Sequence, residues 1–266
     1  MLKLENIHKV FNYGKVNVNH ALNGVDLSLS EGDFLTIIGS NGAGKSTILN
    51  IVAGTYTPEI GRVVVDGKDV TRWPTHKRAS FVGRVFQDPL RGTAAEMTIE
   101  ENLSLAYMRG KRRGLKLGLN KKRRDEFRER LSWLGLGLED RLEDPVKLLS
   151  GGQRQALTLL MATLGEPIIL LLDEHTAALD PKTAEQIINI TRRIVEKNKL
   201  TVLMVTHNMK QALEMGNRTI MMDKGKIILE LQGEEREKMT IGELVKKFSE
   251  KSGQELTDDR VLLAKE

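Results

Sequence analysis

Hydrophobic and polar positions alternate over the first part of the chain in the pattern of β-strands, whose successive side chains point to opposite faces. The strands that this pattern predicts are Leu2–Val10, Val25–Leu29, Phe34–Ile38, Arg62–Val65 and Lys68–Val70. Asp66-Gly67 stands between the last two, and Asp-Gly is typical of a two-residue hairpin turn. The N-terminal part is therefore expected to be mainly β-structure.

Helical patterns follow from residue 46 onward. The expected helices are Ser46–Ala53, segments of the stretch from Thr98 to about Leu134, Ser150–Leu164, Thr183–Lys197 and a short amphipathic helix near Ile241–Phe248. Residues 183–197 connect two buried strands, Ile168–Leu172 and Leu200–Thr206. This strand-helix-strand order implies a parallel sheet, so the chain is predicted to be an α/β protein. Thr219–Asp223 and Ile227–Leu231 predict a closing hairpin.

Composition narrows the class of protein. Of the 266 residues, 40% are hydrophobic and 29% charged, the balance of a globular chain. The longest aliphatic run is Ile168–Leu172, far below the roughly 20 residues of a membrane-spanning helix. The absence of cysteine excludes disulfides and thiolate zinc sites and fits a reducing compartment. The first residues lack the apolar region of a secretory signal.

The net charge of +5 is concentrated in one segment. Residues 109–130 contain eleven Lys or Arg and three Asp or Glu, which leaves the rest of the chain at net −3. Aromatic residues, at 4%, are too sparse for the stacking platforms of single-strand nucleic-acid binders. The segment is open to two interpretations: a contact for anionic lipid headgroups, or a solvated basic helix or loop.

A glycine-rich motif marks the first candidate site. Gly39–Ser46 matches GxxxxGK[ST] between a predicted strand and a predicted helix, where backbone N–H groups converge on phosphate oxygens. Lys45 is expected to reach the terminal phosphates and Ser46 to bind Mg²⁺. The expected nucleotide contacts of this loop are Ser40, Asn41, Gly42, Ala43, Gly44, Lys45, Ser46 and Thr47. The motif predicts a site for a nucleoside triphosphate.

Two acids follow the buried strand at 168–172. Asp173 is placed to hold Mg²⁺ through water, and Glu174 to orient and polarise an attacking water. Such a strand end is also a common helix entry, so the functional interpretation depends on the phosphate-binding motif beside it.

Leu149–Gln153 opens a helix with the sequence Leu-Ser-Gly-Gly-Gln. Ser150 fits an ordinary N-cap, but Gly151 and Gly152 would also let backbone amides approach an anion. A second phosphate-binding helix is one too many for a single nucleotide. The simplest explanation is that it serves the nucleotide of another subunit.

In these motifs and their order the sequence resembles the ATP-binding cassette (ABC) ATPases over nearly its whole length. Gly39–Ser46, Ile168–Glu174 and Leu149–Gln153 correspond to the Walker A, Walker B and signature motifs. The further matches are Gln87 to the Q-loop glutamine, Ala177–Asp180 to the D-loop, His207 to the switch histidine, and Phe11 or Tyr13 to the aromatic residue that stacks on adenine. His175 departs from the family, because a proline usually follows the Walker B glutamate.

The resemblance implies an active ATPase whose head-to-tail dimer holds ATP between one Walker A motif and the partner's signature motif. The dimer is formed by two copies of this chain or with a paralogous ATPase. The implied roles are catalysis by Glu174, His207 and Gln87, Mg²⁺ binding by Ser46, Gln87 and Asp173, and contact with the partner's nucleotide by Ser150, Gly151, Gly152, Gln153 and Asp180.

The resemblance also implies a single P-loop NTPase domain with a mainly parallel sheet. Residues 1–89 and 149–233 would form the core with an N-terminal antiparallel β subdomain, 90–148 a helical subdomain, and 234–266 a short helical tail.

The first functional hypothesis is the ATPase subunit of a membrane transporter, on the cytoplasmic face of the membrane, that imports an amino acid or other small organic solute. Its expected partners are integral membrane permease subunits and a solute-binding protein. The alternative is a soluble ABC ATPase acting on nucleic acid or the ribosome. Only 127 residues separate Lys45 from Asp173, too few for the long coiled coil of DNA-repair members, so no nucleic-acid partner is expected.

Overall fold

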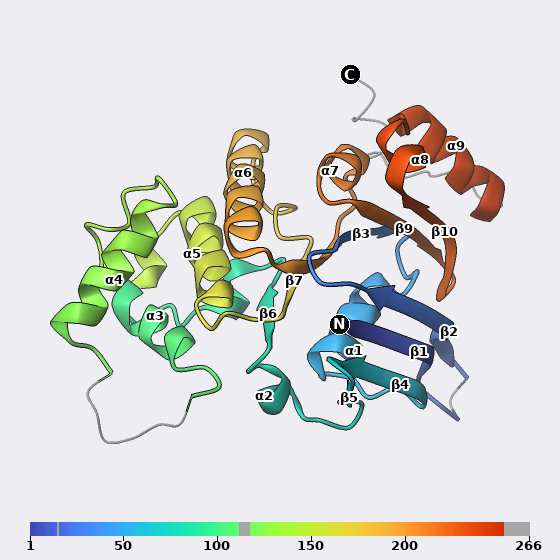
Figure 1. Cartoon of the computed structure of the whole chain (residues 1–266), viewed down its shortest axis with the longest axis horizontal. Coiled ribbons are helices and arrows are strands. Elements are labelled where there is room, and N and C mark those ends of the chain that lie inside the picture. The colour runs from blue at the N-terminus through green and yellow to red at the C-terminus, as the bar shows by residue number, and fades with distance from the viewer. Residues whose placement is uncertain (15, 112–117, 253–266) are drawn as a thin grey trace. The chain divides into compact units, whose positions relative to one another are not determined.

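The computed structural model describes residues 1–14, 16–111 and 118–252, which fold into two compact units (Figure 1). The first unit consists of residues 1–78 and the chain from residue 200 onward. The second consists of residues 79–199. Each unit has its own strands, helices and buried core.

An antiparallel sheet opens the first unit. Its strands, in spatial order, are β2 (Asn19–Leu29), β1 (Leu2–Phe11), β4 (Ile60–Val65) and β5 (Lys68–Asp69). β2 begins six residues before Val25, where the alternating pattern places its start. The reason is that Gly24, at φ +72, and the register shifts around Ile7 of β1 interrupt the alternation.

A parallel group of strands completes the sheet structure of this unit. β3 (Phe34–Gly39) lies between β8 (Thr201–Val205) and β9 (Arg218–Asp223) and runs parallel to both. β10 (Lys226–Gln232) pairs antiparallel with β9. The turn Lys224-Gly225 has φ of +46 and +76, the left-handed pair that a tight hairpin requires, and the predicted closing hairpin is confirmed.

The helices of the first unit are α1 (Lys45–Ala53), α2 (Thr75–Arg78), α7 (Met209–Glu214), α8 (Gly233–Glu237) and α9 (Ile241–Ser252). The sequence pattern predicts α1 and α9 but not the other three, because helices of four to six residues are too short to show a hydrophobic period. Leu244 and Phe248 of α9 share one core cluster with Met209 and Ala212 of α7.

Arg78 is a fully buried cation at the end of this unit's first segment. Its five N–H groups all donate to backbone carbonyl oxygens, at 2.6–3.2 Å. The accepting residues are Ile51, Val52, Val70, Thr71 and Trp73. Burial lowers the pKa of Arg78 to about 10, so the guanidinium stays charged at neutral pH. It caps the C-terminal end of α1, where the helix dipole favours a positive charge.

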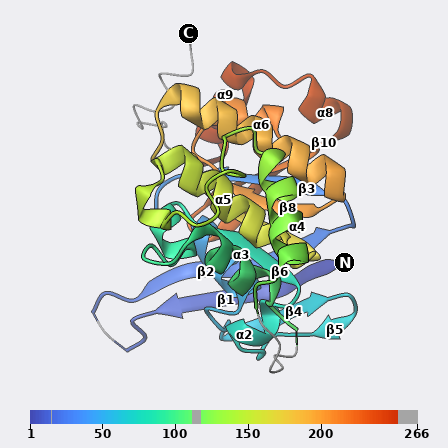
Figure 2. The ribbon, with the colours of Figure 1, turned by 90° about the vertical axis from the view of Figure 1, so that its left-hand side faces the viewer.

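The second unit is built on two parallel strands, β6 (Val82–Val85) and β7 (Ile169–Asp173). Its helices are α3 (Ile99–Tyr107), α4 (Lys121–Ser132), α5 (Gly151–Thr163) and α6 (Pro181–Asn198), with 3₁₀ turns η1 (Pro89–Gly92) and η2 (Val146–Leu148). α5 and α6 lie side by side, as Figure 2 shows. The sequence pattern does not predict β6, whose four residues include Gly83 and Arg84.

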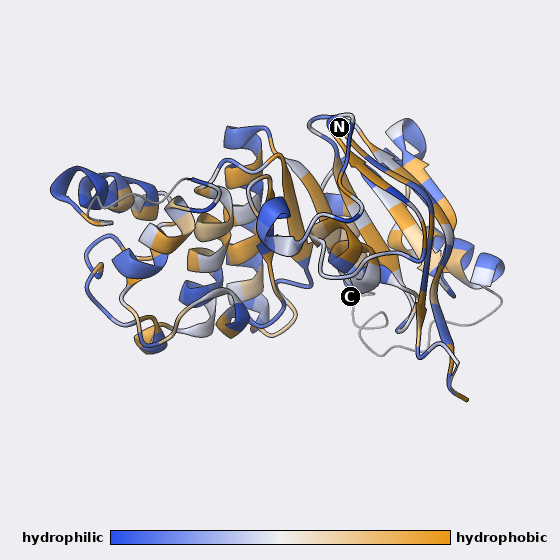
Figure 3. Cartoon of the chain, turned by 90° about the horizontal axis from the view of Figure 1, so that it is seen from below, coloured by the Kyte–Doolittle hydropathy of each residue, from blue (hydrophilic) through white to orange (hydrophobic). Residues whose placement is uncertain are grey.

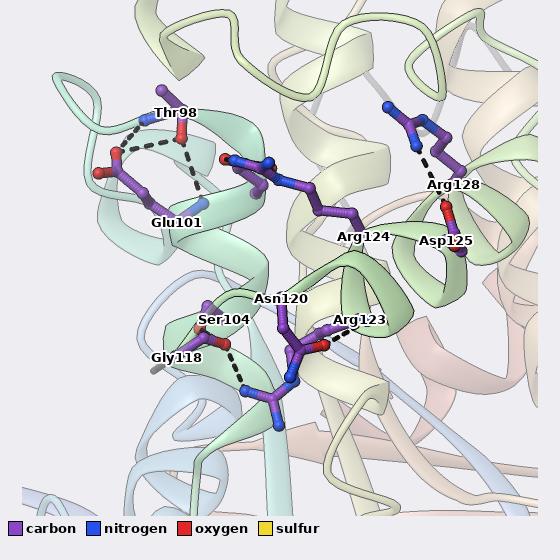
Figure 4. A network of polar contacts seen from close by, with 10 residues as sticks. Thr98, Glu101, Ser104, Gly118, Asn120, Arg123, Arg124, Asp125 and Arg128 are labelled. Atoms are coloured by element: carbon purple, nitrogen blue, oxygen red, sulfur yellow. Dashed lines mark hydrogen bonds and ion pairs between the residues drawn. The ribbon is translucent and has the colours of Figure 1, made fainter. Parts of the chain in front are cut away.

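The charge of residues 109–130 is partly paired within the helices (Figure 4). Arg124 of α4 donates two hydrogen bonds, of 2.7 and 2.8 Å, to the Glu100 carboxylate of α3. Further ion pairs along α4 are Arg128–Asp125 and Arg130–Glu126. Figure 3 shows α4 as a largely hydrophilic helix. Residues 112–117, with three more cations, lie outside the described residues, and the lipid contact stays a prediction.

Candidate functional site

The glycine-rich loop joins β3 to α1 in the first unit. Gly39 and Gly44 have φ of +147 and +100. A Cβ on Gly39 would overlap the Met222 carbonyl oxygen, and one on Gly44 would overlap that of Ala21. Only glycine fits both positions. No side chain caps the N-terminus of α1, so this end of the helix is suited to an anionic ligand.

Lys45 is 5% exposed and lies along the loop, with Nζ donating to the carbonyl oxygens of Gly39 at 2.9 Å and Ser40 at 2.8 Å. Among the other predicted phosphate contacts, the exposed ones are Asn41, Gly42 and Ser46, and those at least partly buried are Ser40, Ala43, Gly44 and Thr47. The structure therefore brings the predicted loop residues together in one compact turn.

The β9–β10 turn supports this loop. Ser40 Oγ donates to Asp223 Oδ1 at 2.9 Å, and the Gly225 N–H donates to the Ala43 carbonyl oxygen at 3.1 Å. Sequence reasoning misses Asp223 because it lies 183 residues from Ser40, and no local pattern distinguishes it from an ordinary hairpin residue.

Phe11 and Tyr13 lie in different surroundings. The Phe11 ring meets the Tyr56 ring edge to face, with centroids 5.2 Å apart, and Lys9 Nζ lies 5.3 Å from the Phe11 centroid. Tyr13 is 88% exposed. Of the two candidates for stacking on adenine, only Phe11 is held by neighbouring side chains, and Tyr56 is a neighbour that sequence reasoning misses.

His207 lies between β8 and α7 in the first unit and is half-buried. The residues on either side fix this turn. The Asn208 N–H donates to Thr206 Oγ1 at 3.0 Å, and Asn208 caps α7 by accepting from the Gln211 N–H. The predicted switch histidine is therefore held on a short, well-bonded turn after a strand.

Asp173 ends β7 in the second unit and forms an ion pair with Arg84 of β6, with 3.0 Å between Oδ2 and Nη2. The Arg84 guanidinium also lies over the Phe86 ring, 4.6 Å from its centroid. Glu174 follows with φ of +47, in the left-handed region that is costly for a residue other than glycine. Its carbonyl oxygen accepts from the Ala177 N–H at 2.9 Å.

His175, the departure from the family pattern, is 1% exposed. Its Nε2 lies 3.1 Å from Thr191 Oγ1 in the middle of α6. Burial lowers the pKa of His175 to about 4, so the ring is neutral at neutral pH. Where the family has proline, this chain has a buried polar contact to α6.

The Leu-Ser-Gly-Gly-Gln motif starts α5 with a reciprocal capping box. Ser150 Oγ accepts from the Gln153 N–H, and Gln153 Oε1 accepts from the Ser150 N–H, both at 3.2 Å. Gly152 is buried against α6, and a Cβ there would overlap Thr183 Cγ2. A Cβ on the exposed Gly151 would meet only Leu179, at an ordinary 3.5 Å. The ordinary N-cap of Ser150 is confirmed. The close packing of α5 on α6 is enough to explain why residue 152 is glycine.

Gln87 and Asp180 complete the predicted positions in this unit, and both are exposed. Gln87 lies between β6 and η1, where Gln155 Nε2 of α5 donates to the preceding carbonyl oxygen, of Phe86, at 3.2 Å. Asp180 caps α6 by accepting from the Thr183 N–H at 3.1 Å.

Comparison with known proteins identifies the family. Residues 22–177 match the family model described as ABC transporter. The chain belongs to the ABC transporter family. It is 44% identical over 248 residues to a tyrosine transport ATP-binding protein of Clostridioides difficile, which covers 93% of this chain and 98% of that relative. It is 35% identical over 235 residues to methionine import ATP-binding protein MetN 1 of Bacillus thuringiensis, covering 86% and 66% respectively.

Solved structures agree with this assignment. A dimeric ATP-binding cassette in a post-hydrolysis state, bound to ADP and Pi, matches with a TM-score of 0.74 at 33% identity, covering 87% of this chain and 98% of that one. The predicted family and P-loop fold are confirmed, and this ABC cassette is an ATP-binding subunit that hydrolyses ATP. None of the helices described is both long and apolar enough to cross a membrane.

The oxygen donors at the predicted Mg²⁺ positions suit that ion. Within the described residues of this ABC cassette, no cluster of three or more His, Asp or Glu is arranged to hold a metal. Ser46, Asp173 and Gln87 offer a hydroxyl, a carboxylate and an amide oxygen. Each of these is a hard oxygen donor of the kind that suits Mg²⁺, which takes few protein ligands and completes its shell with water and substrate phosphates.

Proposed function

We propose that this ABC cassette is the ATPase subunit of an importer for an amino acid or another small organic solute. The observation that carries this is the 44% identity to a tyrosine transport ATP-binding protein over almost the full length of both chains. Methionine import relatives support the same class of solute. The cassette would act at the cytoplasmic face of the membrane, with permease subunits and a solute-binding protein, and residues 90–148 would form its helical subdomain.

The proposed roles follow the geometry of each unit. The loop amides and Lys45 bind the phosphates, Phe11 stacks on adenine, and Glu174 orients and activates the attacking water with the help of His207 and Gln87. Ser46, Asp173 and Gln87 would hold Mg²⁺, which neutralises charge on the phosphates when bound.

The signature motif is proposed to act on the nucleotide of a second subunit. Ser150 and Gly151 are exposed at the N-terminus of α5, and Asp180 is exposed at that of α6. A solved relative is a dimer bound to ADP and Pi, which supports the presence of a second subunit. The second subunit is another copy of this chain or a paralogous ATPase. In either dimer, each nucleotide would contact the glycine-rich loop of one subunit and the signature motif of the other.

The test is the solution mass of the Glu174→Gln variant with and without Mg-ATP. ATP is expected to convert monomer to dimer, and Lys45→Ala added to this variant should prevent the conversion. A variant that binds ATP but stays monomeric contradicts the homodimer. Uptake of radiolabelled tyrosine and methionine by cells that carry Glu174→Gln in place of the wild-type chain tests the solute class, because uptake of the true solute should stop.

A further inference from the structure

The hydrogen bond between His175 and Thr191 has a defined direction. Thr191 Oγ1 lies 2.8 Å from the Ile187 carbonyl oxygen, which can only accept, so the hydroxyl hydrogen is committed to that bond. His175 Nε2 must therefore donate to Thr191 Oγ1 across 3.1 Å. The neutral ring then carries its proton on Nε2.

Packing alone does not require an imidazole here. In the described structure, no group donates to His175 Nδ1, which is buried. An apolar side chain of similar volume would fill the space without burying an unsatisfied acceptor. What the imidazole adds is a directional bond from the residue after Glu174 to the middle of α6.

That bond lies beside a strained residue. Glu174 has φ of +47, and the surrounding structure must hold a non-glycine residue in this region. The Ala177 N–H to Glu174 carbonyl bond closes the turn on one side. The bond from His175 fixes its other side to α6, a helix that also packs against Gly152 through Thr183.

We propose that His175 is a positioning residue for Glu174. Its Nε2–H bond to Thr191 fixes the turn that aims the Glu174 carboxylate, and so sets the rate of hydrolysis without touching the nucleotide. The proposal rests on the proposed role of Glu174 as the group that activates water.

The experiment compares steady-state ATP hydrolysis by Thr191→Val and Thr191→Ser. Valine has the shape of threonine but cannot accept the His175 hydrogen bond, so kcat should fall by about tenfold, as for other small misplacements of a catalytic group. KM for ATP should stay near the wild-type value, whereas the thermal midpoint should fall by a few degrees, because the buried Nε2–H loses its acceptor. Serine retains the hydroxyl and should restore kcat.

Two further variants separate this effect from general changes in packing. Thr163→Val makes the same change in α5, where the buried Thr163 hydroxyl also bonds to carbonyl oxygens of its own helix, at 3.0 and 3.2 Å. It should leave kcat unchanged. His175→Phe keeps an aromatic ring, somewhat larger than imidazole, without the donor. It should reproduce the loss seen with Thr191→Val, which keeps the test open if one variant folds poorly.

The outcomes distinguish this inference from the proposed function. If Glu174→Gln hydrolyses ATP at the wild-type rate, the proposed role of Glu174 fails. If Glu174→Gln is inactive while Thr191→Val and His175→Phe have wild-type kcat, only the positioning role is overturned. Equal losses in Thr191→Val and Thr191→Ser would also overturn it, because the effect would then not depend on the hydroxyl.

Discussion

Arg84 and Asp173 form an ion pair of 3.0 Å between neighbouring parallel strands, with side chains only 14% and 15% exposed. The guanidinium is further held by the Phe86 ring. A carboxylate proposed to bind Mg²⁺ is therefore oriented by a cation from the next strand before any nucleotide arrives.

Removing one partner of this pair should destabilise the fold. Arg84→Met is expected to lower the free energy of unfolding by about 2 kcal/mol, because it leaves a largely buried carboxylate without that cation. Asp173→Asn alone should also destabilise, and the double variant should cost less than the sum of the two. Urea denaturation without nucleotide measures this cycle, and strictly additive losses would show that the pair contributes nothing.

Arg78 provides a second test of stability. Arg78→Met removes donors from five backbone carbonyl groups and should cost about 3 kcal/mol, whereas Arg78→Lys keeps the charge and should cost less. Arg62→Met is the matched control, because Arg62 pairs with Glu5 at the surface with 67% of its side chain exposed. That control should stay within about 0.5 kcal/mol of the wild type in the same urea titration.

The glycine-rich loop proposed to bind phosphate could be predicted because its pattern is local: a strand, three glycines, a lysine and a helix follow one another in sequence. The contact through which the β9–β10 turn supports this loop could not be predicted, because Asp223 accepts the Ser40 hydrogen bond from a position 183 residues further along the chain. The strand β6 could not be predicted from local sequence either. A Cβ on Gly83 would press on the Ala162 carbonyl oxygen of α5, and Arg84 finds its partner 89 residues away, so both residues are explained only by tertiary contacts.

His175 shows the same limit within the predicted Walker B region. The sequence identifies it as a departure from the family pattern, but its contact with Thr191 depends on how α6 packs against the turn. Local patterns therefore indicate the candidate site residues, while the contacts that orient them come from residues far along the chain.

Asp180, the N-cap of α6, should make the stability of the fold depend on pH in the acid range. Hydrogen bonds from the Thr183 side chain and then its backbone lower the pKa of Asp180 below the usual 3.8. The charged cap therefore stabilises the fold above that value, and this contribution is lost as the pH falls through the lower pKa of the folded state. Asp180→Asn keeps a capping side chain without the charge. Its unfolding free energy, measured from about pH 5 to pH 2, should fall less steeply than that of the wild type. Parallel curves would contradict this.

Gly152 allows the packing and functional roles of the signature motif to be separated. Gly152→Ala places a methyl group on Thr183 Cγ2 and should destabilise by about 1–3 kcal/mol, whereas Gly151→Ala meets no close contact and should not. Thr183→Ala in the Gly152→Ala background removes the obstructing methyl group and should recover much of the lost stability in a urea titration.

ATP hydrolysis by this double variant then shows whether the clash with Thr183 accounts for any loss of activity. The Cβ added by Gly152→Ala points at Thr183 of α6 in the same chain, so once this clash is removed hydrolysis should recover together with stability. Thr183→Ala alone is the control for any effect of the second change on activity. Hydrolysis that stays low although stability is restored would show that Gly152 does more than allow α5 to pack on α6.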